Sequence, residues 1–426
     1  MPQLTPLSRL DGIYPQRQAG FFMQRVKLAA GVISADQART VAAVAARFGQ
    51  GAIHLTTRGS MEIHWLHEAD LLAVKRELAK VGLTSRGACG GAVRGVTCAS
   101  QGAAGFPVVE VLAARLQKHF TGNPRFERLP KKFKIGVETD TLGRRHLIQD
   151  VGLVYSSHTE GVAYFDLYAA GGLGREPQPG FLFEAGVSEN RIIPLIEAIA
   201  RVYAAHSPAG KRLKHLLRDV GEEQFRRLVA QDPSATEELS AQEGLNSNLI
   251  HQPPTQRLVV RIPAGELNSR HLITLADHAD SWQLGFLMVT ADQDIAFHLH
   301  ESSDPVEAAA ELEAAGIQQA TINFRTCPGT ATCKAGLSAT REVVSQLTAL
   351  ISAQGKLLTW AISGCPNSCT QPQLADVGIV SSALVKGEDG ERTPRFDLYR
   401  SGDAPFGTLV ERALTLDELC SRVAGM

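Results

Sequence analysis

The sequence contains an internal repeat, because residues 21–83 carry a pattern that recurs at about 255–317. In each copy an alternating stretch leads to a small-residue turn, then to Ala- and Leu-rich helical spacing, then to two β-rich runs separated by a polar turn. A further helical stretch follows, at 69–83 in the first copy and at 304–317 in the second. This order is like half of a ferredoxin-like α+β unit, so we expect a duplicated chain with halves related by a pseudo-twofold axis.

Each repeat is followed by a region of mixed α/β character that holds most of the remaining glycines and turns. A polar stretch at 240–256, which contains Pro253-Pro254, is the expected linker between the halves. The expected division is a first ferredoxin-like half-domain at 1–83, an α/β domain at 84–250, a second half-domain at 251–317 and a second α/β domain at 318–426.

Composition excludes several classes of protein. The chain has 426 residues, enough for two to four domains and for a large buried cofactor. A formal charge of -1 with 20% charged residues gives no basic footprint, so we expect no nucleic acid as a partner. No run of about 18 apolar residues occurs, and the start lacks the features of a signal peptide, so we expect a cytoplasmic protein without a membrane partner.

Four of the seven cysteines lie in two short loops that contain glycine, both within the last quarter of the chain. Cys327 and Cys333 are spaced C-x5-C, and Cys365 and Cys369 are spaced C-x3-C. A 4Fe-4S cluster needs four thiolates, one for each iron, and amides in such loops stabilise its charge. A zinc site also uses four cysteines but favours tighter spacing, and buried cysteines that act as small hydrophobes explain one or two of them at most.

These loops resemble those of the siroheme-dependent sulfite and nitrite reductases. The run GCPNSC, then Gln371 and then ADVGI is similar to the second cluster loop of that family, and the C-x5-C loop is similar to the first. The resemblance implies two cofactors, siroheme and a 4Fe-4S cluster, with the α/β domains binding them. It implies that Cys369 bridges a cluster iron and the siroheme iron. Asn367 matches a position that approaches the macrocycle, although a turn residue in the left-handed conformation explains it equally well.

Three segments of the first half supply basic residues in the order that the family has them. They are TTR with Arg58, a glycine-rich loop with Arg94, and LPKKFK with Lys132 and Lys134. The resemblance implies that these four bind the anion and deliver protons, although a lone Arg in a turn is more often solvated surface. The repeat places Ala291 opposite Arg58, so we expect one active site for each duplicated chain.

A further basic residue, Lys214, matches a family position near a siroheme carboxylate, but it lies in a highly charged amphipathic helix where a solvated face is as good an explanation. The glycine-rich segment 168–180 resembles one that lines the cofactor cavity. No NAD or flavin motif is present. The remaining cysteines, Cys89, Cys98 and Cys420, are expected to be packing residues.

The resemblance implies an oxidoreductase that reduces sulfite to sulfide with six electrons from an external donor such as ferredoxin or a flavoprotein. Nitrite reduction to ammonia is the nearest alternative, and it is disfavoured because nitrite-specific members tend to have a neutral residue at the position of Lys134. A precorrin-3B synthase-like member usually lacks the lysine pair. A carrier or zinc scaffold without siroheme leaves the basic residues unexplained.

Overall fold

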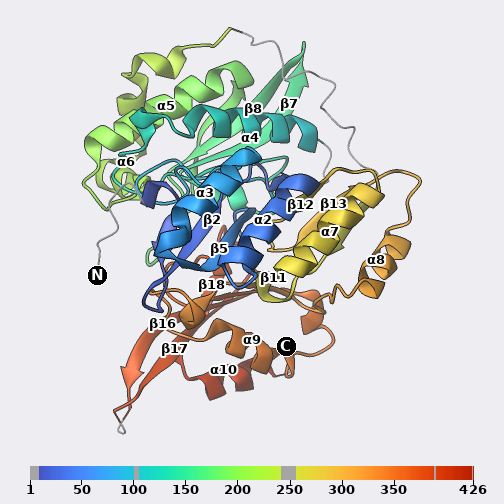
Figure 1. The fold of residues 1–426 in the computed structure, drawn as a ribbon. Helices are drawn as coiled ribbons and strands as arrows, with labels where there is room; N and C mark the ends of the chain where they lie inside the picture. Colours follow the sequence, from blue (N-terminus) through green and yellow to red (C-terminus); the bar gives the residue numbers. More distant parts are fainter. Residues whose placement is uncertain (1–8, 100–104, 241–255, 388–389, 425) are drawn as a thin grey trace.

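A computed structural model describes residues 9–99, 105–240, 256–387, 390–424 and 426 (Figure 1). The expected linker at 240–256 lies almost entirely outside the described residues. In Figure 1 the paired repeats lie between the first α/β region, in green, and the second, in orange and red. No helix in the described part of the chain is both long and apolar enough to cross a membrane.

The two repeats have the same order of strands and helices, as the sequence predicts. The first contains β2 (Phe21–Val26), β3 (Val32–Ser34), α2 (Ala35–Phe48), β4 (Ala52–Thr56), β5 (Ser60–His67) and α3 (Leu71–Lys80). The second contains β10 (Gln256–Val260), β11 (Glu266–Asn268), α7 (Ser269–Ser281), β12 (Phe286–Val289), β13 (Ile295–Leu299) and α8 (Pro305–Ala314). The prediction of a duplicated, pseudo-twofold α+β chain is therefore confirmed.

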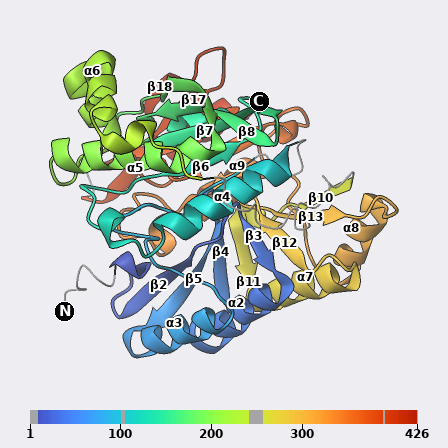
Figure 2. The same ribbon diagram turned by 90° about the horizontal axis from the view of Figure 1, so that it is seen from above.

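The repeats exchange one short strand each. Strand β11 of the second repeat pairs with β4 of the first, and β3 of the first pairs with β12 of the second. Strand β1 (Ile13–Pro15) extends the first sheet. Figure 2 shows α2, α3, α7 and α8 along the outer edge, with the strands of both repeats on their inner side. One hydrophobic core contains buried residues from both repeats, so neither repeat buries its apolar face alone.

Similar capping begins the long helix of each repeat. The Ser34 side chain accepts a hydrogen bond from the backbone N–H of Gln37, whose side chain returns to the Ser34 backbone. In the second repeat Asn268 accepts from the backbone N–H of His271. The local sequence therefore starts both helices at equivalent positions.

The first α/β region consists of one sheet and its helices. The sheet has the order β6-β7-β8-β9, with β6 and β7 parallel and the other pairs antiparallel. The strands are β6 (Ile135–Glu138), β7 (Val151–Thr159), β8 (Val162–Ala169) and β9 (Phe181–Ser188). The helices are α4 (Phe106–Phe120), α5 (Glu189–His206) and α6 (Leu213–Ala230).

The second α/β region repeats this plan with one more parallel strand. Its sheet has the order β14-β15-β16-β17-β18, and its first two pairs are parallel. The strands are β14 (Asn323–Thr326), β15 (Thr359–Ser363), β16 (Val377–Lys386), β17 (Arg392–Arg400) and β18 (Thr408–Leu414). Helices α9 (Thr340–Thr348) and α10 (Leu416–Val423) pack against it.

Candidate active site

Arg58 lies in the turn between β4 and β5. Its guanidinium donates to Oε1 of Gln149 at 3.2 Å and to the carbonyl oxygen of Gly95 at 2.7 Å. The next residue, Gly59, has a φ of +57°, and a Cβ there would lie 3.1 Å from both the Cα of Gly31 and the carbonyl oxygen of Val289. Only glycine allows the turn to approach both neighbours so closely, and this approach positions Arg58.

Backbone pairing brings Arg94 to the lysine segment. The backbone N–H of Arg94 donates to the carbonyl oxygen of Phe133 at 2.8 Å, and Phe133 stands between Lys132 and Lys134. The Arg94 side chain is buried and donates to the carbonyl oxygens of Gly87 and Gly90, at 3.1 and 2.9 Å. Among the described residues the Arg94 guanidinium makes no ion pair with a carboxylate, so its charge is not neutralised by one.

The structure brings the four expected basic residues together, because Arg94 lowers the pKa of Arg58 and Lys132, and these two in turn lower the pKa of Lys134. Burial lowers the pKa of Arg58 to about 9, with Arg94 as the next cause. Burial also lowers the pKa of Lys134, and the charges of Arg58 and Lys132 lower it further. Lys132 has a lowered pKa from burial, then from Arg212 and Arg94. Like charges held together in this way make a site that favours an anion.

Two further basic residues belong to this site and were missed by the sequence analysis. Lys27 is 4% exposed, and its Nζ donates to Oγ1 of Thr121 at 2.9 Å. Burial lowers the pKa of Lys27 to about 7, and the charges of Arg94 and Arg58 contribute to this lowering. Arg212, 4% exposed, pairs with Asp150 at 2.7 Å. Arg212 directly precedes a charged helix and Lys27 directly follows β2, so neither carries a local sequence signal.

The four cysteines follow two parallel strands. Cys327 comes directly after β14, and Cys365 and Cys369 come after β15, its parallel neighbour. Because the carboxyl ends of parallel strands meet at one edge of a sheet, both loops start from the same place. Cys333 follows in the first loop, after the 3-10 helix η7 (Gly329–Ala331).

The thiols interact with one another and with backbone amides. Burial raises the pKa of Cys327, Cys333 and Cys365, and the charge of Cys369 raises each of them further. The backbone N–H of Gly364 donates to Sγ of Cys327 at 3.2 Å. Bound iron ions would relieve the repulsion among the thiolates, and backbone amides that donate to sulfur stabilise the charge of an iron–sulfur cluster.

The arrangement fits a cluster better than a single ion. No group of three or more His, Cys, Asp and Glu side chains in the described ranges is placed to hold one metal ion. A zinc site would need its four thiolates about 2.3 Å from one centre. A 4Fe-4S cluster distributes its ligands over four irons, so its cysteines stand farther apart.

The cysteine loops and the basic residues form one site across the two halves. Oγ1 of Thr57 donates to the carbonyl oxygen of Cys369 at 2.7 Å, and Thr57 directly precedes Arg58. The charge of Cys369 also raises the pKa of Lys132, against the larger effect of burial. The thiol that was expected to be shared between two cofactors therefore lies near enough to Lys132 for their charges to interact.

Lys214 does not lie on a solvated face of its helix. It is 2% exposed, and its Nζ donates to the carbonyl oxygens of Leu173, at 3.2 Å, and of Glu176. Burial lowers the pKa of Lys214 to about 8, followed by the charges of Arg212 and Arg218. The lysine thus holds the glycine-rich segment 168–180, because the helix turns this face inward.

The structure adds detail at two other expected positions, Asn367 and Ala291. Asn367 is exposed, and the residues with left-handed backbone in its loop are Ser368 and Gln371, with φ of 53° and 59°. Asn367 instead donates to the thiol of Cys365. Ala291 is buried, and its turn spans 290–294 against 57–59 in the first repeat, so the turn of the second repeat is two residues longer.

Comparison with known proteins supports the resemblance to the sulfite and nitrite reductases. Residues 14–81 match the nitrite/sulfite reductase ferredoxin-like half domain, and residues 92–237 match the nitrite and sulphite reductase 4Fe-4S domain. Similar proteins include sulfite reductase (ferredoxin) 2 of Mycolicibacterium paratuberculosis, which is 26% identical over 94% of this chain and 78% of the relative. Ferredoxin–nitrite reductase of Synechococcus elongatus is 27% identical over 93% of this chain and 83% of the relative.

The fold is also that of a solved structure. The NirA protein of Mycobacterium tuberculosis superposes with a TM-score of 0.82 at 24% identity, over 98% of this chain and 85% of that one. The two domain matches cover both parts of the first half, and the relatives align along almost the whole chain. This chain therefore belongs to the nitrite and sulfite reductase family, and it is an oxidoreductase whose cofactors are siroheme and a 4Fe-4S cluster.

Proposed function

We propose that the protein reduces sulfite to sulfide, with six electrons and loss of the three oxygens as water. One observation carries this proposal, namely that the group of charges around Arg58 has more cations than anions. Within the described residues Arg58, Arg94, Lys132 and Lys134 form no ion pair with a carboxylate. The nearby carboxylates Asp150 and Glu62 are engaged by Arg212 and Arg25. An anionic substrate supplies the missing negative charge.

The cofactor ligands follow from the same placement. Cys327, Cys333, Cys365 and Cys369 would hold the 4Fe-4S cluster, and Cys369 would also reach the siroheme iron. Asn367 lies in the loop that would face the macrocycle. Lys214 would act through the segment 168–180, whose carbonyls it holds, and through its charge on a siroheme carboxylate.

When bound, siroheme and the cluster would carry electrons from the external donor to the oxyanion. The protein residues bind, orient and protonate. Arg58 and Arg94 have fixed guanidiniums suited to the oxygens of an oxyanion. Lys132 and Lys134 have lowered pKa values, so they release protons more readily than an ordinary lysine does. They are the proposed proton donors to the oxygens that leave as water.

Sulfite is the first choice over nitrite on grounds of charge. Sulfite reaches the dianion near neutral pH and nitrite is a monoanion, so an additional lysine favours sulfite. The relatives do not decide between sulfite and nitrite as the substrate, since their names include a sulfite reductase (ferredoxin) and a ferredoxin–nitrite reductase. Both names contain ferredoxin, so a ferredoxin is the proposed electron donor.

The test compares the two anions with one artificial donor. The holoenzyme is assayed with reduced viologen and either sulfite or nitrite, and its visible spectrum is recorded first. We expect siroheme bands, and a kcat/KM for sulfite above that for nitrite by at least about tenfold, which is about 1.4 kcal/mol. A higher kcat/KM for nitrite would make the protein a nitrite reductase.

A further inference from the structure

Thr57 and Gln371 form a reciprocal pair of hydrogen bonds between the two halves. Oγ1 of Thr57 donates to the carbonyl oxygen of Cys369 at 2.7 Å. Nε2 of Gln371 donates to the carbonyl oxygen of Thr57 at 3.0 Å. Each of the two side chains therefore reaches the backbone of the other segment, and both side chains are buried. Thr57 precedes Arg58, and Gln371 follows Cys369 by two residues.

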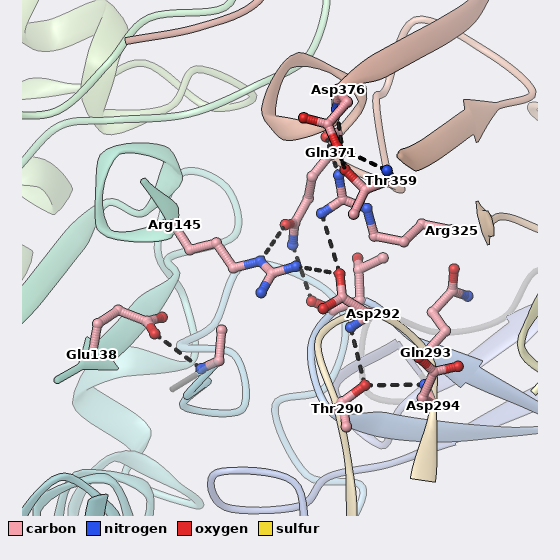
Figure 3. Close-up of polar contacts among 12 residues, drawn as sticks. Glu138, Arg145, Thr290, Asp292, Gln293, Asp294, Arg325, Thr359, Gln371 and Asp376 are labelled. Atoms are coloured by element: carbon pink, nitrogen blue, oxygen red, sulfur yellow. Dashed lines mark hydrogen bonds and ion pairs between the residues drawn. The ribbon is translucent and has the colours of Figure 1, made fainter. Parts of the chain in front are cut away.

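The amide of Gln371 is oriented by an ion pair. Nε of Arg145 donates to Oε1 of Gln371 at 3.1 Å, and the same guanidinium pairs with Asp292 at 2.6 Å. Figure 3 shows Arg145 pointing at both residues, with Arg325 on the other side of Gln371. Because Oε1 must face Arg145, Nε2 must face the carbonyl oxygen of Thr57.

The backbone of Gln371 is held as well. Gln371 has a φ of 59°, and its carbonyl oxygen accepts from Arg325 at 3.3 Å. Arg325 is 2% exposed and lies in β14, the strand that leads into the first cysteine loop. A non-glycine residue keeps left-handed backbone only where its surroundings determine it. The contacts of Gln371 thus join both cysteine loops to the first repeat.

We propose that Thr57 and Gln371 are positioning residues that set the place of Cys369 relative to Arg58. This inference rests on the proposed function, because it assumes that Cys369 is a cofactor ligand and that Arg58 binds the oxyanion. The two hydrogen bonds join the backbone just before Arg58 to the loop that contains Cys369. Its loss shifts the thiolate against the bound anion, while Arg58 keeps its own partners, Gln149 and Gly95.

The test removes the Thr57 hydroxyl with little change of shape. Thr57→Val lowers kcat by about tenfold or more, because small misplacements of reacting groups are costly, while KM changes by less than about threefold. The visible and electron paramagnetic resonance signals of the siroheme iron in the resting holoenzyme shift, because Cys369 would be a ligand of that iron and such signals depend on the ligands. Thr57→Ser restores both. Thr40→Val, which removes an exposed hydroxyl of α2, is the control and leaves both unchanged.

A second variant tests the partner. Gln371→Met keeps the length of the side chain but loses the amide, and it gives the same spectral shift. The double variant Thr57→Val with Gln371→Met is little worse than either single one, because both changes break one unit. Wild-type spectra and kcat in Thr57→Val, or no recovery in Thr57→Ser, would overturn the proposal. The resting spectra do not depend on which anion is reduced. A wild-type enzyme that is inactive with both anions would therefore refute the proposed function, while the spectral comparison of Thr57→Val with the wild type would still test this proposal.

Discussion

The backbone N–H of Arg94 donates to the carbonyl oxygen of Phe133 at 2.8 Å, and the backbone N–H of Phe133 donates to the carbonyl oxygen of Ala92 at 3.0 Å, so two bonds align the glycine-rich loop with the lysine segment. Val93 and Phe133 form a parallel bridge, so the residues on either side of it come side by side. Lys132 and Lys134 flank Phe133 and alternate with it, because successive side chains in an extended chain point to opposite sides. The two bonds thus bring a buried guanidinium into one group of interacting charges with the two ammonium groups.

Replacing Lys134 by Asn should change the choice of substrate. The variant loses one fixed cation, so kcat/KM for sulfite falls by about tenfold or more and for nitrite by less, because the dianion interacts more strongly with that charge. Initial rates with reduced viologen give both values. Lys131→Asn, which removes an exposed charge next to the pair, should leave the ratio unchanged. Equal losses for the two anions in Lys134→Asn would contradict this role.

Replacing a cysteine of the loops should remove the cluster. Cys365→Ser leaves one iron without its thiolate, so iron and acid-labile sulfide for each chain fall to a small fraction of the wild-type content. Chemical analysis of the purified proteins measures this. Cys420→Ser is the matched control, since Cys420 lies in α10 outside the two loops. Wild-type iron content in Cys365→Ser would rule out its role as a ligand.

The lowered pKa of Lys27 should make the stability of the folded protein depend on pH. Its pKa is lowered to about 7 in the folded protein, below the ordinary value of a lysine, so between these values the unfolded chain binds one more proton than the folded one. The contribution of Lys27 to stability therefore rises with pH through this window. Melting temperatures measured from about pH 7 to pH 10 should rise less steeply in Lys27→Met than in the wild type. Parallel curves for the two proteins would exclude a lowered pKa.

Adding one methyl group beside Arg58 should destabilise the turn. Gly59→Ala places a Cβ against the Cα of Gly31 and the carbonyl oxygen of Val289, at a positive φ. We expect a loss of about 1–2 kcal/mol in the free energy of unfolding and a higher KM for the anion, because Arg58 moves with the turn. Gly143→Ala is the control, because its Cβ would meet nothing within 4 Å. An unchanged KM in Gly59→Ala would show that the turn does not position Arg58.

Several features of this protein were determined by local sequence. The repeat, its strand and helix order and the helix starts at Ser34 and Asn268 follow from hydrophobic spacing and capping residues, which act over a few positions. The two cysteine pairs were visible because each stands in one short loop. Arg58, Arg94 and the lysine pair were found through resemblance to the family, and their charges alone would have read as ordinary surface.

Tertiary structure decided the rest, because burial and long-range pairing have no local signature. Lys214 was equally compatible with a solvated face until the fold turned it inward, and Lys27 and Arg212 became part of the site only through packing between distant segments. Thr57 and Gln371 are separated by 314 residues, and their hydrogen bonds exist only because the pseudo-twofold halves meet at the cysteine loop. The sequence thus determined the parts of the site, while the packing of the two halves determined which side chains complete it.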